Sequence, residues 1–222
     1  MSLHLSKERI SVVTIPKCLS TSLCHFFFAL ENGVEADELV VKGKPAKINV
    51  HKHYFTHGFE KCKELSGRGF WRATFVRDPM SRIISTYRNR ILHAEILKKQ
   101  GVTDKKLLNS LPSRPDLETF VMNLESYQKA HKKVLHHTHP LSYFLGKKPS
   151  YFNRIYTMKQ VAEFRDEMKN RMKRPVPEVR RLYTEGPEFS VSDLNQKCRN
   201  HIETMFEEDY RIFGKYFEQQ RA

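Results

Sequence analysis

The stretch SVVTIPKCLSTSLCHFFFAL, residues 11–30, joins an apolar run, a proline break and a Ser/Thr-rich segment that leads into a second apolar run. Residues 10–15 are rich in β-branched side chains and stop at Pro16, a pattern typical of a buried strand. A helix is expected from about Ser20. Free backbone N–H groups, three hydroxyls and the positive end of the helix dipole would then meet at one point, which predicts an anion site. An ordinary strand-to-helix connection with good capping residues is the plainer alternative.

The remaining pattern predicts alternating strands and helices. We expect strands at 48–55 and 70–76, and helices at 80–99, 158–173 and 191–208. A polar excursion at 100–115 precedes a helix that Asp116 caps, and Ser190 with Asp193 forms a capping-box pattern. This order predicts an α/β fold with a mainly parallel sheet flanked by helices, and 222 residues suit a single domain over 1–222.

Composition narrows the class of partner. The chain carries 39 Lys and Arg against 25 Asp and Glu, a formal charge of +14, so its surface should attract an anion such as nucleic acid, a phosphorylated cofactor or an acidic polysaccharide. The four cysteines are scattered, which favours reduced thiols. We expect no transmembrane segment and no signal peptide, hence a cytoplasmic protein, although a lumenal domain cut from a membrane anchor would look the same.

A second motif follows the strand expected at 70–76. In RDPMSRIISTY, Asp78 and Pro79 begin a helix, and Arg82 and Ser85 fall three residues apart on one helical face. An arginine at the carboxyl edge of a strand, with a serine on the next helix, is suited to gripping a phosphate. Taken alone, the same letters also describe a capped amphipathic helix with surface arginines.

Together the two segments resemble the sulfotransferases that use 3'-phosphoadenosine 5'-phosphosulfate. PKCLSTS is similar to their 5'-phosphosulfate loop P-K-x-G-S-T-S, with Leu19 in place of glycine. RDPMSRIISTY matches every fixed position of their 3'-phosphate motif R-D-P-x-x-R-x-x-S-x-Y. HTHPLSYFLG resembles a segment of the carbohydrate-acting branch, and FEEDYRIFG resembles the usual end of the domain. A leucine does not take positive φ cheaply, so we expect this loop to differ in detail from the glycine form.

The resemblance implies a fold of the P-loop type, a co-substrate and a set of roles. Lys17 and the Ser20, Thr21 and Ser22 amides would hold the 5'-phosphosulfate, and Lys17 would also stabilise the departing phosphate. Arg77 and Ser85 would bind the 3'-phosphate. The acceptor would be a hydroxyl, expected on a carbohydrate, and the chemistry demands no metal.

A histidine cluster, HKHYFTHGF, lies between the two motifs. If 50–55 is a strand, His51 and His53 share one face and His57 follows at its end. Histidine is a suitable general base for an acceptor hydroxyl, and resemblance to a Lys-His pair favours His53, with His51 and His57 in reserve. Structural histidines, or a metal site shared with the histidines near residue 137, are the alternatives. No metal site is expected, because no acidic or cysteine ligand is spaced to complete one.

Two other functions compete with sulfuryl transfer. A nucleotide or small-molecule kinase is disfavoured because the loop G-x-x-x-x-G-K-[ST] is missing. A basic nucleic-acid-binding module is compatible with the charge but does not explain the paired motifs, so nucleic acid is not the expected partner. The basic connector at 169–183 suits either an anionic glycan or a solvated mobile loop. The oligomeric state is not indicated.

Overall fold

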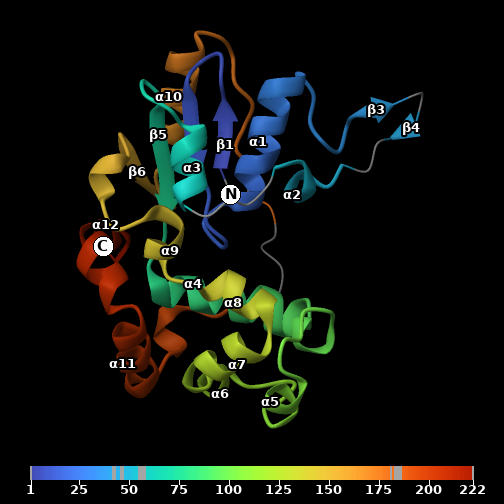
Figure 1. Cartoon of the computed structure of the whole chain (residues 1–222), viewed down its shortest axis with the longest axis vertical. Coiled ribbons are helices and arrows are strands. Elements are labelled where there is room, and N and C mark those ends of the chain that lie inside the picture. The colour runs from blue at the N-terminus through green and yellow to red at the C-terminus, as the bar shows by residue number, and fades with distance from the viewer. Residues whose placement is uncertain are drawn as a thin grey trace. The chain divides into compact units, whose positions relative to one another are not determined.

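The computed structural model describes residues 2–41, 44–45, 48–54, 59–180, 182 and 187–221 (Figure 1). The chain divides into two compact units. The sheet unit comprises Met1–Val76, Tyr143–Leu182 and Lys215–Ala222. The helical unit comprises Arg77–Ser142 and Tyr183–Gly214.

The sheet unit is built on strands in the order β1-β2-β5-β6. These are β1 (Ser2–Leu5), β2 (Ile10–Val13), β5 (Trp71–Val76) and β6 (Arg154–Thr157). β1 pairs antiparallel with β2, whereas β2, β5 and β6 are parallel. Val12 pairs with Ala73, and both are fully buried, as expected for a parallel sheet with helices on its faces. The predicted α/β fold with a mainly parallel sheet is confirmed.

Two long helices of the sheet unit pack together through aromatic side chains. Phe26 of α1 (Ser20–Asn32) meets Phe164 of α10 (Val161–Met172) at a ring distance of 5.8 Å. Phe164 also contacts Phe75 of β5 at 5.1 Å, edge to face, a favourable aromatic geometry. The unit's other described elements are β3 (Val40–Val41), β4 (Lys44–Pro45), α2 (Val50–His53), α3 (Phe59–Leu65) and the 3-10 turn η3 (Pro149–Tyr151).

The helical unit has a core of its own, to which Ile83, Phe120, Tyr127 and Ile202 belong. Its elements are α4 (Pro79–Thr86), the π-helix η1 (Tyr87–His93), the 3-10 turn η2 (Ile96–Lys98), α5 (Lys105–Asn109), α6 (Leu117–Met122), α7 (Leu124–Ala130), α8 (Lys132–Thr138), the 3-10 turn η4 (Val191–Asp193) and α11 (Gln196–Met205). Two further helices, α9 (Leu141–Leu145) and α12 (Glu207–Arg221), have residues in both units.

A buried carboxylate joins two distant segments of the helical unit. Asp209 is 0% exposed and accepts hydrogen bonds from the backbone N–H groups of Leu141 (2.5 Å) and Ser142 (2.9 Å). Burial raises the pKa of Asp209, while these two N–H groups and the Arg82 guanidinium act to lower it. Leu141 and Ser142 lie within the segment HTHPLSYFLG, and Asp209 lies within FEEDYRIFG. This contact therefore gives both sequence segments a structural role.

The strand predicted at 48–55 is wrong. Its described residues form α2, a single helical turn at Val50–His53 that is followed by an extended Tyr54. The cause is local. The Asn49 side chain accepts a hydrogen bond from the His51 N–H at 3.1 Å, and this cap favours a helical turn over pairing with a neighbouring strand. His51 and His53 therefore do not alternate across a sheet as expected.

Other predicted elements are confirmed with altered bounds. Strands lie at Ile10–Val13 and Trp71–Val76, and α1 begins at Ser20. The helix expected at 80–99 changes from α to π to 3-10, and the one expected at 191–208 divides into η4, α11 and the start of α12. Asp116 caps α6 through the Thr119 N–H at 2.7 Å. Strands β1 and β6 were not predicted, and the excursion at 100–115 contains α5.

Replacing Asp209 tests the buried acceptor. Asp209→Ala leaves two backbone N–H groups without their acceptor, and each such loss costs about 1–3 kcal/mol. We expect the free energy of unfolding to fall by about 2–4 kcal/mol in urea titrations. Asp166→Ala, at an exposed position, is the control and should change it by no more than about 0.5 kcal/mol. Equal stabilities of the two variants would contradict the assigned role.

Candidate functional site

The loop between β2 and α1 has an unusual backbone. Lys17 has φ +68° and Leu19 has φ +59°, both in the left-handed region. The turn is closed by a hydrogen bond from the Cys18 N–H to the Ile15 carbonyl at 3.1 Å. Leu19 thus takes a conformation natural to the glycine it replaces, at a cost of about 1–2 kcal/mol for a residue with a Cβ. Such strain is typical of functional loops.

The first amides of α1 have no acceptor within the helix. The Leu19 carbonyl accepts from the Leu23 N–H at 2.9 Å, so the N–H groups of Ser20, Thr21 and Ser22 precede the first intrahelical donor. Within the described residues, Leu19 supplies no side-chain cap, and the first turn carries no acidic residue. α1 has 13 residues, so its dipole adds positive potential at this end.

The side chains around these amides suit an anion. Lys17, Ser20 and Thr21 are partly exposed, whereas Ser22 is 3% exposed and can contribute mainly through its backbone. A lysine, two accessible hydroxyls and a helix N-terminus therefore share one short segment. The anion site predicted from the sequence stays a prediction. Leu19 takes the left-handed conformation, although we expected a leucine to make this loop differ from the glycine form.

One histidine of the cluster reaches this loop. His51 Nε2 lies 2.8 Å from Thr21 Oγ1, a hydrogen bond whose donor depends on the imidazole tautomer. His53 has different neighbours: its ring meets Phe28 at 5.4 Å and Tyr54 at 4.8 Å, both edge to face. His57 lies outside the described residues. No sequence pattern predicted the contact between His51 and Thr21, because the expected strand would have placed His51 and His53 on the same face.

The second motif belongs to the helical unit, and several of its fixed positions are structural. Asp78 is 4% exposed, caps α4 through the Met80 N–H at 2.8 Å and accepts from the Tyr210 hydroxyl at 3.3 Å. Arg82 is 1% exposed and donates to the His139 carbonyl at 3.0 Å. Tyr87 is also buried, and its hydroxyl donates to the Pro115 carbonyl at 3.1 Å.

Two fixed positions of this motif remain partly exposed. Arg77 lies directly before the cap of α4, and Ser85 lies on its last turn. The motif therefore separates into buried positions that shape the unit and two accessible polar side chains that suit a phosphate. Arg77 and Ser85 are the residues predicted from the sequence to bind the 3'-phosphate. Arg82, which was expected on the same helical face as Ser85, is buried.

The basic connector of the sheet unit is bound to its neighbours. Arg171 pairs with Glu167 at 2.6 Å, and Arg174 donates to the Leu30 carbonyl at 2.9 Å. Arg180 donates to both oxygens of Asp37, at 3.0 and 3.1 Å. These contacts leave less free positive charge for a glycan than the sequence suggested.

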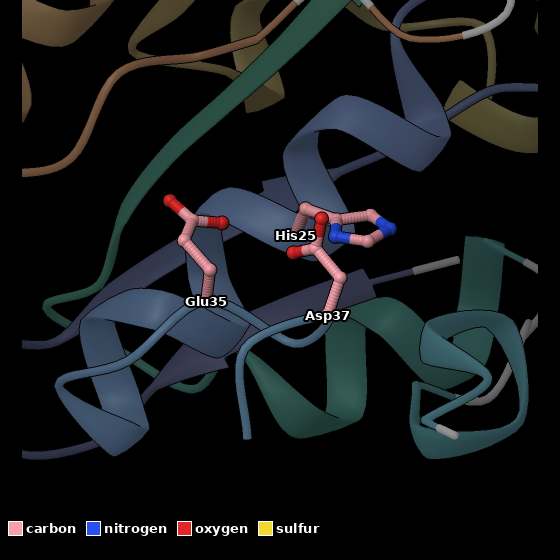
Figure 2. Close-up of side chains that lie close together, drawn as sticks. All are labelled: His25, Glu35 and Asp37. Carbon is pink, nitrogen blue, oxygen red and sulfur yellow. The ribbon is translucent and has the colours of Figure 1, made fainter. Parts of the chain in front are cut away.

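Three side chains that could ligate a metal also gather here, at His25, Glu35 and Asp37. Their ligand atoms lie within 4.8 Å of one another, and Figure 2 shows the Asp37 carboxylate beside the His25 ring, with Glu35 on its other side. Arg180 already balances the carboxylates, lying 3.6 Å from Glu35 as well as bonding Asp37. A backbone hydrogen bond and the Arg180 guanidinium lower the pKa of Asp37. We interpret the group as an ion-pair cluster, and within the described part of the chain no such group includes His136, His137 or His139.

Comparison with known proteins identifies the class. The sulfotransferase family model matches residues 4–216, so the chain belongs to the sulfotransferase family. Neither the curated proteins nor the solved structures contain a match. Family membership favours sulfuryl transfer over the phosphoryl transfer of a kinase and over the nucleic-acid-binding module. No helix among the described residues is long and apolar enough to span a membrane.

The Leu19 backbone gives a direct test of the loop. Glycine has no Cβ to clash at positive φ, whereas alanine keeps that penalty. We therefore expect the Leu19→Gly protein to be more stable than the Leu19→Ala protein by about 1 kcal/mol, measured by urea unfolding. Both variants lose the leucine side chain, so each controls for the other. Equal stabilities would contradict a left-handed residue 19.

Proposed function

We propose that this protein transfers a sulfuryl group from 3'-phosphoadenosine 5'-phosphosulfate to a hydroxyl on a carbohydrate acceptor. The observation that carries the proposal is the start of α1, where a left-handed turn presents successive amides beside Lys17. Such a site fits the phosphosulfate end of this co-substrate. The co-substrate, when bound, supplies an activated sulfuryl group on a phosphate leaving group.

The loop of the sheet unit would do most of the electrostatic work. Transfer by in-line displacement forms a bond from the acceptor oxygen to sulfur and breaks the bond from sulfur to the bridging oxygen. Negative charge grows on that bridging oxygen as its bond breaks, and the Lys17 ammonium is suited to stabilising it. The amides of Ser20, Thr21 and Ser22 would hold the non-bridging oxygens. This role demands no metal.

In the helical unit, Arg77 and Ser85 would bind the 3'-phosphate. A guanidinium donates to two phosphate oxygens at once, and a serine hydroxyl adds a third donor. Their partial exposure supports the assignment, because the other basic residue of the motif, Arg82, is buried and bonded to a backbone carbonyl.

The acceptor proton requires a general base. The resemblance pointed first to His53, with His51 and His57 in reserve, and the contact between His51 and Thr21 now favours His51. A base must lie close to the reacting group, and His51 touches a hydroxyl of the proposed phosphosulfate loop. His53 contacts two aromatic rings and suits a packing role at least as well.

A transfer assay tests the proposed function itself. Protein with 3'-phosphoadenosine 5'-phosphosulfate labelled in its sulfuryl group should label a hydroxyl-bearing glycan from a panel of neutral and anionic carbohydrates. The formal charge of +14 favours an anionic one. Activity should survive a chelator. Labelling of small phenols or steroids in place of every glycan would contradict a carbohydrate acceptor, and no label on any acceptor would contradict the activity.

Arg77 gives the sharpest test of the 3'-phosphate grip. Arg77→Ala removes a charge-assisted contact, so binding of adenosine 3',5'-bisphosphate should weaken by about 1.5–3 kcal/mol in calorimetric titrations. Arg114→Ala is the matched control: it removes an exposed arginine of the same unit that pairs with Glu95. It should leave the dissociation constant within about twofold. Equal affinity of both folded variants for the bisphosphate would remove Arg77 from the site.

The histidines can be separated by turnover. His51→Ala should lower the transfer rate by roughly 10²–10⁴-fold with bisphosphate affinity nearly unchanged, because a general base acts on the acceptor. His53→Ala should cost much less. A large loss only in the His53→Ala protein would return the role to His53, and full activity of both would leave His57→Ala as the next variant to measure.

A further inference from the structure

Residues 49–54, called the histidine segment below, form a helical turn that is too short to be stable by itself. α2 contains four residues, and isolated helices far longer than this are marginal in water. Its internal hydrogen bonds, from the Lys52 and His53 amides to the Asn49 carbonyl, fix its shape but not its position. Its position must come from side-chain contacts with the rest of the sheet unit, including Val50, which is 3% exposed.

Those contacts run along α1. Thr21 binds His51, Phe28 meets the His53 ring, and Glu31 accepts a hydrogen bond from the Tyr54 hydroxyl. The three α1 residues are seven and then three positions apart, which keeps them along one side of a helix. Three residues, His51, His53 and Tyr54, thus contact α1 at points from its first turn to its last.

The loop between β2 and α1, residues 14–19, is called the anion loop below. Tyr54 contacts Glu31 at the end of α1 that lies away from this loop. Burial raises the pKa of Tyr54, and the hydrogen bond to the Glu31 carboxylate raises it further, so the phenol stays protonated and remains a donor. The Tyr54 ring also packs against the His53 ring at 4.8 Å. This end of the segment is therefore fixed by a directional bond as well as by ring packing.

We propose that Tyr54 and Glu31 are positioning residues, whose hydrogen bond holds the α2 turn so that His51 reaches Thr21 at the anion loop. The role in turnover rests on the proposed function, in which His51 is the base. Neither residue touches the reacting groups. A small displacement of a catalytic group can lower the reaction rate strongly. Loss of the hydrogen bond between Tyr54 and Glu31 should therefore lower turnover by displacing His51.

Two substitutions isolate the hydrogen bond. Tyr54→Phe removes only the hydroxyl and keeps the ring against His53, and it should lower turnover by roughly 10-fold to 100-fold with bisphosphate affinity unchanged. Glu31→Gln retains an acceptor oxygen and should lose less turnover than Glu31→Ala. Tyr151→Phe is the matched control, because it removes a tyrosine hydroxyl bonded to Ser66 (2.6 Å) elsewhere in the sheet unit. It should change turnover by less than about twofold.

A double-mutant cycle separates positioning from a general structural effect. If Tyr54 acts through His51, Tyr54→Phe should cost less than about twofold once His51→Ala is present. A further loss in the double variant as large as in the single one would overturn the proposal.

Amide hydrogen exchange, measured without any substrate, keeps the test independent of activity. The N–H of Tyr54 donates to the Val50 carbonyl at 3.0 Å and that of His53 to the Asn49 carbonyl at 3.1 Å. Tyr54→Phe should speed exchange at both amides by at least about fivefold, and Tyr151→Phe should not. Unchanged exchange overturns the positioning role whatever the activity. Faster exchange in the Tyr54→Phe protein, together with a wild-type protein that transfers no sulfuryl group, would support the positioning of α2 and contradict the proposed function alone.

Discussion

The left-handed turn at Lys17 and Leu19 is the constraint on which the rest of the site depends. It reverses the chain between a buried strand and a buried helix, within a few residues. The conformation of Leu19 carries a cost that glycine would avoid. In the proposed function, this turn lets the first amides of α1 and the Lys17 ammonium hold the same anion.

α1 then serves two purposes. Its inner face packs Phe26 into the aromatic core with Phe164, and another side carries Thr21, Phe28 and Glu31. The histidine segment lies along that second side. α1 therefore has two positions to fix. Its first residues follow the loop between β2 and α1, and its Thr21 side chain holds His51 next to that loop. In the helical unit, buried Asp78 and Arg82 give α4 its shape and leave Arg77 partly exposed.

Much of the fold could be predicted, because its strongest elements have local signals. β-branched runs and the Pro16 and Pro79 breaks marked β2, β5 and the starts of the following helices. The edge strands β1 (SLHL) and β6 (RIYT) lack the continuous β-branched run that marked β2, and pairing with the sheet decides them.

Sequence motifs allowed residue-by-residue predictions for the candidate site, as at Lys17 and Arg77, and these stay predictions. It was not predictable where tertiary contacts decide. His51 and His53 were assigned to a strand because their neighbours alternate, yet the Asn49 cap makes a helical turn and contacts with α1 place each ring. Tyr54 and Glu31 are 23 residues apart, and no local pattern links them.

In the proposed function, this chain recognises an adenosine bisphosphate through both of its phosphate ends. Calorimetric titration of the wild-type protein with adenosine 3',5'-bisphosphate, beside adenosine 5'-monophosphate, measures this directly. We expect binding of the bisphosphate at a single site, and at least about tenfold weaker binding of the monophosphate, since one charge-assisted contact contributes about 1.5–3 kcal/mol. Equal affinity for the two nucleotides, or binding of neither, would contradict the account.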